Sequence, residues 1–149
     1  MKAEELLKKY GMGKHPENGY YLETHYKHIG EGRPASGSIY YYLEPNVISE
    51  FHKIDCDEYW IYNAGSPLEI WLYDENGKLE IKKLGLSDGD PNIYIKKGTT
   101  FAARHSEKTS EGTFITCITV PRFSPAGFTL YTRSEITEKY PESEKFYKR

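Results

Sequence analysis

The sequence predicts an all-β domain, a sandwich or barrel, with short helices at both ends. Ten short segments rich in aromatic and β-branched residues recur along the chain, most of them separated by turns that contain Gly, Pro or Asn. Fourteen of the 149 residues are tyrosine, an aromatic residue that is enriched in strands. The length suits one hydrophobic core, so we expect a single domain over residues 1–149.

The expected elements follow from local patterns. In residues 3–10 the glutamates come first and the lysines last, which predicts a helix that Gly11 ends. The pair Asn76-Gly77 predicts a hairpin, because both residues tolerate positive φ. Residues 134–149 predict one or two short helices broken at Pro141. Strands are expected at residues 20–27, 38–44, 50–54, 57–63, 68–74, 78–84, 92–96, 99–104, 113–120 and 127–132.

Composition excludes several classes of protein. The net charge is −2 and the two signs are mixed, so no basic stripe indicates nucleic acid. No segment approaches the roughly 20 apolar residues of a membrane span, and the charged start does not resemble a secretion signal. We expect a cytoplasmic protein that binds no membrane. In that compartment Cys56 and Cys117 are expected to be unpaired buried thiols.

Alternation along residues 57–63 predicts which side chains enter the barrel. If Glu58 points inward, Trp60 and Tyr62 do so too, while Tyr59 and Ile61 point outward. Both faces are then apolar or aromatic, so the outer face also needs a cover. A second subunit is the favoured cover, and we expect a homodimer. The alternative is that the terminal helices cover this face.

Several ordered segments resemble an uncharacterised family of cupins, which are small β-barrel proteins. The first, His15 to Thr24, reads H-P-E-N-G-Y-Y-L-E-T and is similar to that family's signature. Asn18 stands where the family has glycine, and asparagine can also adopt the left-handed conformation. The resemblance covers about residues 4–132. Its other segments are residues 36–43, 51–53, 57–60, 65–69 and 98–103.

The resemblance implies a double-stranded β-helix, the cupin jelly-roll barrel, usually built as a homodimer. It also implies kinship with deoxysugar epimerases such as dTDP-dehydrorhamnose epimerase. Those enzymes carry an R-G-x-F-x-E segment at a nucleotide-sugar site, and residues 18–23 lie in a comparable place without the arginine. The family itself implies no settled activity.

The family's metal motifs are incomplete in this chain. Cupin metal sites use three histidines and a glutamate, and His52, Glu58 and Gly65 fall on the spacing of the first motif. Ile54 and Phe101 stand at two of the histidine positions. We therefore expect no metal cofactor, since two ligands seldom hold a metal tightly. The alternative is a divalent metal held by His52, Glu58 and His105.

A metal-free site would use side chains alone. His52 and Glu58 are the candidate catalytic residues, as an acid/base pair active near pH 7. The structural alternative is a buried pair that only joins two strands. Arg104 is favoured over Arg33 and Arg122 as a clamp for a ligand phosphate or carboxylate. The candidate ligand-binding residues are Tyr21, Glu23, Tyr42, Trp60, Tyr62, Phe101 and Arg104.

Three hypotheses of function follow. The first is an epimerase- or isomerase-like enzyme that acts on a sugar or a nucleotide-linked metabolite, with aromatic side chains lining its pocket. The second is a non-catalytic cupin that binds a small polar ligand. The third is a metal-dependent cupin with the atypical ligand set His52, Glu58 and His105.

Overall fold

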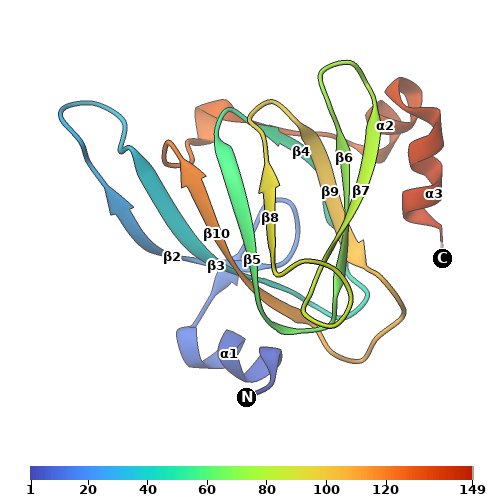
Figure 1. Ribbon diagram of the computed structural model, residues 1–149, viewed down its shortest axis with the longest axis horizontal. Coiled ribbons are helices and arrows are strands. Elements are labelled where there is room, and N and C mark those ends of the chain that lie inside the picture. The colour runs from blue at the N-terminus through green and yellow to red at the C-terminus, as the bar shows by residue number, and fades with distance from the viewer. Residues whose placement is uncertain (149) are drawn as a thin grey trace.

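The computed structural model describes residues 1–148 and consists of two antiparallel sheets that pack face to face (Figure 1). The order of the six-stranded sheet is β1-β2-β3-β10-β5-β8. Its strands are β1 (Gly13–Lys14), β2 (Tyr20–Lys27), β3 (Ser36–Leu43), β10 (Thr113–Val120), β5 (Asp57–Gly65) and β8 (Asn92–Ile95). The order of the five-stranded sheet is β11-β4-β9-β6-β7. Its strands are β11 (Phe128–Leu130), β4 (Ser49–Ile54), β9 (Thr100–His105), β6 (Leu68–Tyr73) and β7 (Leu79–Leu84).

Short helices lie at the two ends of the chain, as expected. Helix α1 (Ala3–Tyr10) ends at Gly11, whose φ of 57° is left-handed. The C-terminal part holds α2 (Arg133–Lys139), the 3-10 turn η2 (Pro141–Ser143) and α3 (Glu144–Tyr147), and a further 3-10 turn η1 (Pro125–Gly127) precedes β11. The break at Pro141 is confirmed. No helix among residues 1–148 is long and apolar enough to cross a membrane.

The jelly-roll fold class is confirmed, and all ten expected strands are present with ends shifted by at most two residues. Strand β1 was not expected, because two residues give no periodic pattern. The hairpin at Asn76-Gly77 joins β6 to β7, but only Gly77 has a positive φ. Asn76 instead donates its backbone N–H to the carboxylate of Asp74 at 2.9 Å. Asn18 does adopt the left-handed conformation, with φ 83°.

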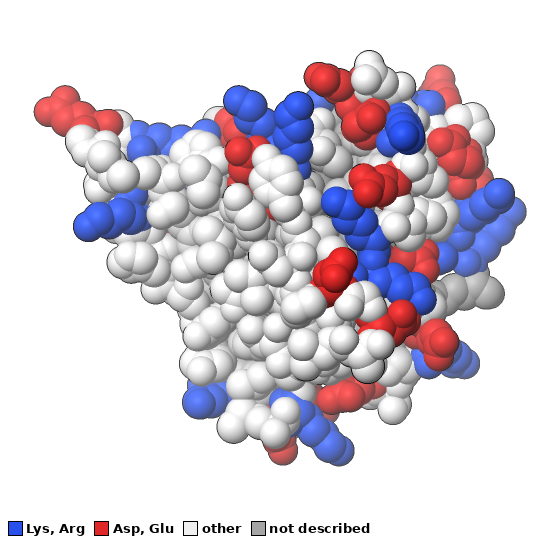
Figure 2. Space-filling model, viewed as in Figure 1, with Lys and Arg blue, Asp and Glu red and all other residues white. Residues whose placement is uncertain are grey.

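The outer faces of the two sheets are covered to different extents. Helices α2 and α3 pack over the five-stranded sheet, where Phe146 contacts Phe51 and Trp71. The terminal helices thus cover the apolar outer face of the five-stranded sheet, which was the alternative to a cover by a second subunit. Helix α1 covers only the end of the six-stranded sheet near Tyr42 and Phe114. The centre of that sheet's outer face carries no charged side chains in Figure 2.

The interior between the sheets has a packed end and an open end. The packed end is a cluster of buried apolar side chains from both sheets. Its members include Leu43, Trp60, Leu68, Ile70, Leu84, Ile95, Phe101 and Ile115. The open end is a pocket, and three segments outside the barrel strands help to line it: residues 15–19 (the N-terminal strap), residues 28–35 (the β2–β3 loop) and residues 121–127 (the β10–β11 connector).

Candidate functional site

The N-terminal strap brings polar side chains over the open end of the barrel. Gly19 allows the strap to lie close, because a Cβ there would come within 2.6 Å of the Tyr42 carbonyl oxygen. The Tyr41 hydroxyl donates to the Asn18 carbonyl at 2.7 Å, and the Asn18 amide donates to the Ile48 carbonyl at 3.0 Å. Glu17 is therefore held against β4 and is 5% exposed.

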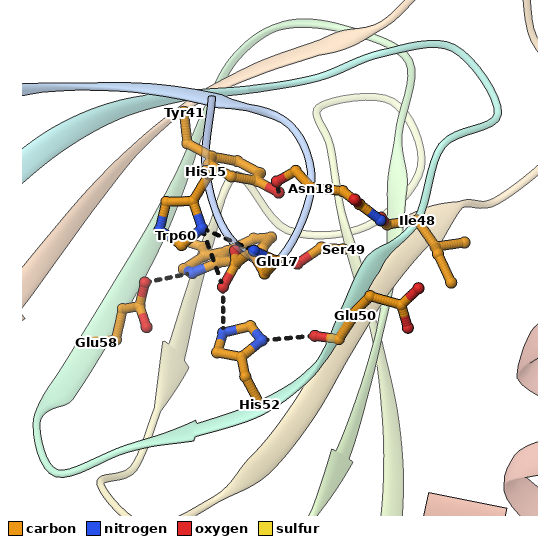
Figure 3. A network of polar contacts seen from close by, with 10 residues as sticks. All are labelled: His15, Glu17, Asn18, Tyr41, Ile48, Ser49, Glu50, His52, Glu58 and Trp60. Carbon is orange, nitrogen blue, oxygen red and sulfur yellow. Dashed lines mark hydrogen bonds and ion pairs between the residues drawn. The ribbon is translucent and has the colours of Figure 1, made fainter. Parts of the chain in front are cut away.

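Glu17 is the hydrogen-bonded partner of His52 (Figure 3). Its Oε2 lies 2.9 Å from Nε2 of His52, and its Oε1 accepts from the Ser49 hydroxyl at 3.1 Å. The other ring nitrogen of His52, Nδ1, lies 2.7 Å from the Glu50 carbonyl oxygen. The expected partner, Glu58, instead accepts from the Trp60 indole N–H at 2.8 Å. The expected His52–Glu58 pair is thus corrected to a Glu17–His52 pair with Glu58 nearby.

Contact between Glu17 and His52 shifts the pKa of each group in the direction that favours its charged form. Burial alone would raise the pKa of Glu17, but His52 outweighs burial and the pKa is lowered. Burial alone would lower the pKa of His52, but Glu17 and the Glu50 carbonyl raise it overall. Both ring nitrogens of His52 face acceptors, an arrangement that favours the imidazolium form. In that form the ring has no lone pair with which to accept a proton or bind a metal.

The pKa values of Glu58 and His15 are shifted in the directions that favour their neutral forms. Burial raises the pKa of Glu58 to about 7, and the negative charge of Glu17 adds to this effect. Burial lowers the pKa of His15, which keeps that imidazole neutral. The Glu17 backbone N–H donates to Nδ1 of His15 at 3.2 Å, so the ring proton is on Nε2, on the side away from Glu17 in Figure 3. Neighbouring groups with opposed protonation states are typical of acid/base sites.

These groups line a pocket of about 670 Å³, a size that suits a small metabolite. His52 and Glu58 line it, as expected, and so do Tyr21 and Glu23. Tyr21 packs on the His15 ring with centroids 4.9 Å apart, and the pocket is also lined by residues that were not among the expected site residues. Phe128 packs 5.8 Å from the His52 ring and 6.3 Å from the His15 ring, measured between ring centroids. Other lining residues that were not among the expected site residues are His15, Glu17, Tyr41, Cys117 and Phe123.

Five expected ligand-binding residues lie outside the pocket lining. Trp60 and Phe101 point inward but are buried beneath it, and Tyr62 packs deeper against the same core. Tyr42 points outward beneath α1, since β3 turns Tyr41 toward the pocket. Arg104 also points outward, pairs with Glu69 at 2.9 Å and donates to carbonyls of the C-terminal segment.

Both cysteines are free and buried, as expected. Cys117 lines the pocket beside Glu58, and burial raises its pKa well above the usual value. The pKa of Cys56 is raised to about 12 by burial. Both are thiols at neutral pH and are therefore poor nucleophiles.

The residues do not fit the four-ligand metal centre of cupins. Ile54 lines the pocket at one histidine position, and at another Phe101 packs on the His52 ring with centroids 4.2 Å apart. His105 lies at the packed end, 3.1 Å from the Thr113 hydroxyl, so it does not join His52 and Glu58. Within residues 1–148 no cluster of three or more His, Cys, Asp or Glu side chains has a metal-binding arrangement.

Comparison with known proteins supports the fold and the family. The model of the Cupin superfamily family DUF985 matches residues 4–131. A crystal structure of a Shewanella oneidensis protein superposes with a TM-score of 0.88 at 25% identity, covering 97% of this chain and 94% of that one. A hypothetical protein from Leishmania major gives 0.83 at 24% identity, covering 97% and 95%.

A third structure is more distant. An oxalate decarboxylase variant from Bacillus subtilis gives a TM-score of 0.62 at 19% identity, covering 89% of this chain and 34% of that one, and this likeness shows the fold alone. No curated protein matches this sequence. The family model spans most of the chain, so this protein belongs to the DUF985 family of the cupin superfamily.

Proposed function

We propose that this cupin is an epimerase- or isomerase-like enzyme that moves a proton on a small carbonyl-containing metabolite, with Glu58 as the catalytic acid and base. The observation that carries the proposal is the pKa of Glu58, raised to about 7 at the floor of a pocket. A carboxyl group with this pKa is present in both protonation states near neutral pH. It can therefore both take and return a proton, which is what isomerisation requires.

The proposed step is proton abstraction next to a carbonyl group. The Glu58 carboxylate takes the proton from the carbon, the C–H electron pair forms a C=C bond, and the carbonyl electrons move to oxygen as an enolate. The neutral His15 supports this step by donating Nε2–H to the enolate oxygen. Glu58 then returns the proton to the same carbon after the enolate has turned over in the pocket, which gives the epimer. Alternatively it returns the proton to the neighbouring carbon on the same face, while the proton of the hydroxyl on that carbon passes to the former carbonyl oxygen, which gives the isomer.

The Glu17–His52 pair has a supporting role in this proposal. Its negative charge lies close enough to Glu58 to raise the pKa of that group, while the positive charge of His52 moderates the effect. Its hydrogen bonds to Ser49 and to the Glu50 carbonyl fix both side chains in place. The pair therefore sets the proton affinity of Glu58 and need not exchange protons itself.

Proton exchange in D₂O tests the proposal. A panel of sugars, nucleotide sugars and small oxo compounds is incubated with the protein and followed by NMR. We expect deuterium to enter at least one compound, and Glu58→Gln to slow this exchange by about 10²–10⁴-fold while binding persists. Glu69→Gln is the matched control, because Glu69 is partly buried on the outer face of the barrel and pairs with Arg104.

Ligand binding without proton exchange would contradict the proposal. If a compound stabilises the wild-type protein against heat but exchanges no proton, the acid/base proposal fails. The protein would then be a non-catalytic binding cupin, since a ligand stabilises the folded state whether or not it reacts. Equal exchange rates in the wild type and in Glu58→Gln would also overturn the role of Glu58.

We also propose that the protein is a homodimer joined through the six-stranded sheet. Support comes from the outward side chains at the centre of this sheet, which are uncharged and form two rows across neighbouring strands. The rows are Tyr40, Thr116, Ile61 and Asn92, and Ser38, Ile118, Tyr59 and Tyr94. Tyr59 and Tyr94 are 37% and 44% exposed, which favours a further partner for this face.

Light scattering after size exclusion tests the dimer. We expect twice the chain mass of 17.3 kDa for the wild type and a single chain mass for Tyr59→Glu. Ile81→Glu is the control, because Ile81 is similarly exposed but lies on an edge strand of the other sheet. A monomeric wild type at micromolar concentration would contradict this proposal.

A further inference from the structure

Two arginines line the mouth of the pocket, and they differ in what their guanidinium groups contact. Arg33 makes four hydrogen bonds that hold the structure together. Its Nε donates to the Arg122 carbonyl at 2.7 Å, and its Nη1 and Nη2 donate to the Asp55 carboxylate at 3.0 and 2.9 Å. Nη2 also donates to the Cys56 sulfur. Arg33 thus ties the β2–β3 loop to the β10–β11 connector.

Arg122 is immobilised from three sides. Its Nε and Nη2 donate to the two carboxylate oxygens of Glu23, at 2.9 and 2.6 Å. Its guanidinium lies 4.1 Å from the centre of the Tyr26 ring. Its Cγ packs on Gly37, where a Cβ would come within 2.9 Å of it. The side chain is therefore ordered before any ligand arrives, so binding a ligand costs it little conformational entropy.

The outer edge of the Arg122 guanidinium remains available. A guanidinium has five N–H donors, and Glu23 uses only the edge formed by Nε and Nη2. Within residues 1–148 no hydrogen bond engages Nη1, and the side chain is 33% exposed. The edge formed by Nη1 and Nη2 has the geometry that binds a carboxylate or phosphate with two parallel hydrogen bonds.

We propose that this edge of Arg122 binds the anionic group of the pocket's ligand, a carboxylate or a phosphate. The inference deepens the proposed function and rests on its assignment of the pocket as the ligand site. Phe123, Phe128 and Ile39 also line the pocket and supply apolar wall. The ligand class that fits is an anionic metabolite with an apolar or ring-shaped middle and a carbonyl group that reaches Glu58.

Binding of simple anions tests the inference without knowledge of the natural ligand. Inorganic phosphate and propionate are titrated separately at low salt, and the arginine Nε–Hε signals are followed by NMR. We expect at least one probe to shift the Arg122 signal, and Arg122→Gln to weaken its binding by about tenfold or more. Whichever probe binds more tightly identifies the anionic group as phosphate or carboxylate.

The matched control is Arg133→Gln. Arg133 also pairs with a glutamate, Glu144, at 2.7 Å and lies 4.7 Å from the centre of an aromatic ring, that of Tyr147, but it is outside the pocket. Its replacement should leave the affinity for both probes unchanged. Arg122→Lys should bind with intermediate affinity, and a thermal melt of each variant verifies that it is folded.

Two results would overturn the inference: neither probe shifts the Arg122 signal in the wild type, or Arg122→Gln binds both probes as the wild type does. The proposed function fails separately. Glu58→Gln should lose proton exchange but keep its affinity for the anion, because Glu58 lies at the pocket floor. Anion binding without exchange in the wild type would therefore remove the acid/base chemistry and leave the Arg122 site in place.

Discussion

The two ends of the barrel interior are built from the same strands, yet one end is filled and the other is open. Strand β5 contributes to both. Its inward positions are Glu58, which lines the pocket, then Trp60, which is 1% exposed, then Tyr62, whose hydroxyl donates to the Gly65 carbonyl at 2.5 Å. Two residues along one strand thus separate a titratable group from the apolar core.

This contrast shows that the packed end sets the chemistry of the open end. Phe101 lies between the two, with its ring centroid 4.2 Å from that of His52 and 5.8 Å from that of Trp60. The aromatic layer excludes water from beneath Glu58, and burial is the main reason that the pKa of Glu58 rises. The apolar core therefore acts as the low-dielectric floor of the pocket.

The largest expected effect comes from removing this layer. Phe101→Ala should lower the free energy of unfolding by about 3–5 kcal/mol, because it leaves a cavity among fully buried side chains. The comparable change at the open end, Phe123→Ala, should cost below about 1 kcal/mol, because Phe123 is 37% exposed at the pocket rim. Chemical denaturation of both variants measures the difference.

Equal losses of unfolding free energy in these two variants would contradict the difference between the packed end and the open end, because they would show that the pocket rim is packed as tightly as the core. Phe101→Ala should also lower the pKa of Glu58, since water entering the cavity would solvate the carboxylate. Carboxyl NMR of Glu58 in the variant measures this shift independently of the loss of stability.

The alternation of inward and outward side chains along single strands predicted much of this arrangement. The inward positions of Glu58 and Trp60 follow from the pattern in residues 57–63 and are confirmed. The same rule could have corrected two other residues. With Phe101 inward, Arg104 must point outward, and with Leu43 inward, Tyr41 faces the pocket while Tyr42 does not.

The remainder of the site depends on long-range packing that no local pattern records. Glu17 meets His52 only because the N-terminal strap folds across β4, where the Glu50 N–H donates to the Glu17 carbonyl at 2.9 Å. The one available signal was the similarity of residues 15–24 to a family signature, which marked the segment without giving its role. The engagement of Arg104 by the carbonyl groups of residues 145, 146 and 148 likewise needs the position of α3.

A smaller expected effect is the pH dependence of the free energy of unfolding. The folded state holds the Glu58 proton up to a pH of about 7, whereas the unfolded chain releases it near the ordinary value of 4.5. At Glu58 the folded state therefore binds more protons in this window, so the contribution of this group makes the free energy of unfolding fall as pH rises from 4.5 to 7, while the lowered pKa of His15 acts in the opposite direction. The shift at Glu58 corresponds to at most roughly 3 kcal/mol. His52 acts in the same direction as Glu58, because its raised pKa means that its stabilising charge is lost at higher pH.

Glu58→Gln isolates the contribution of the carboxyl group. Glutamine resembles the protonated acid and can still accept the Trp60 N–H, so the variant should remain folded. Urea unfolding at pH 5, 6, 7 and 8 should show a much flatter decline than in the wild type, with the variant the more stable of the two at pH 8. Glu80→Gln, at an exposed position of β7, should instead follow the wild type. Parallel curves for Glu58→Gln and the wild type would mean that the open end is solvated like the surface, and the electrostatic contrast between the two ends would be lost.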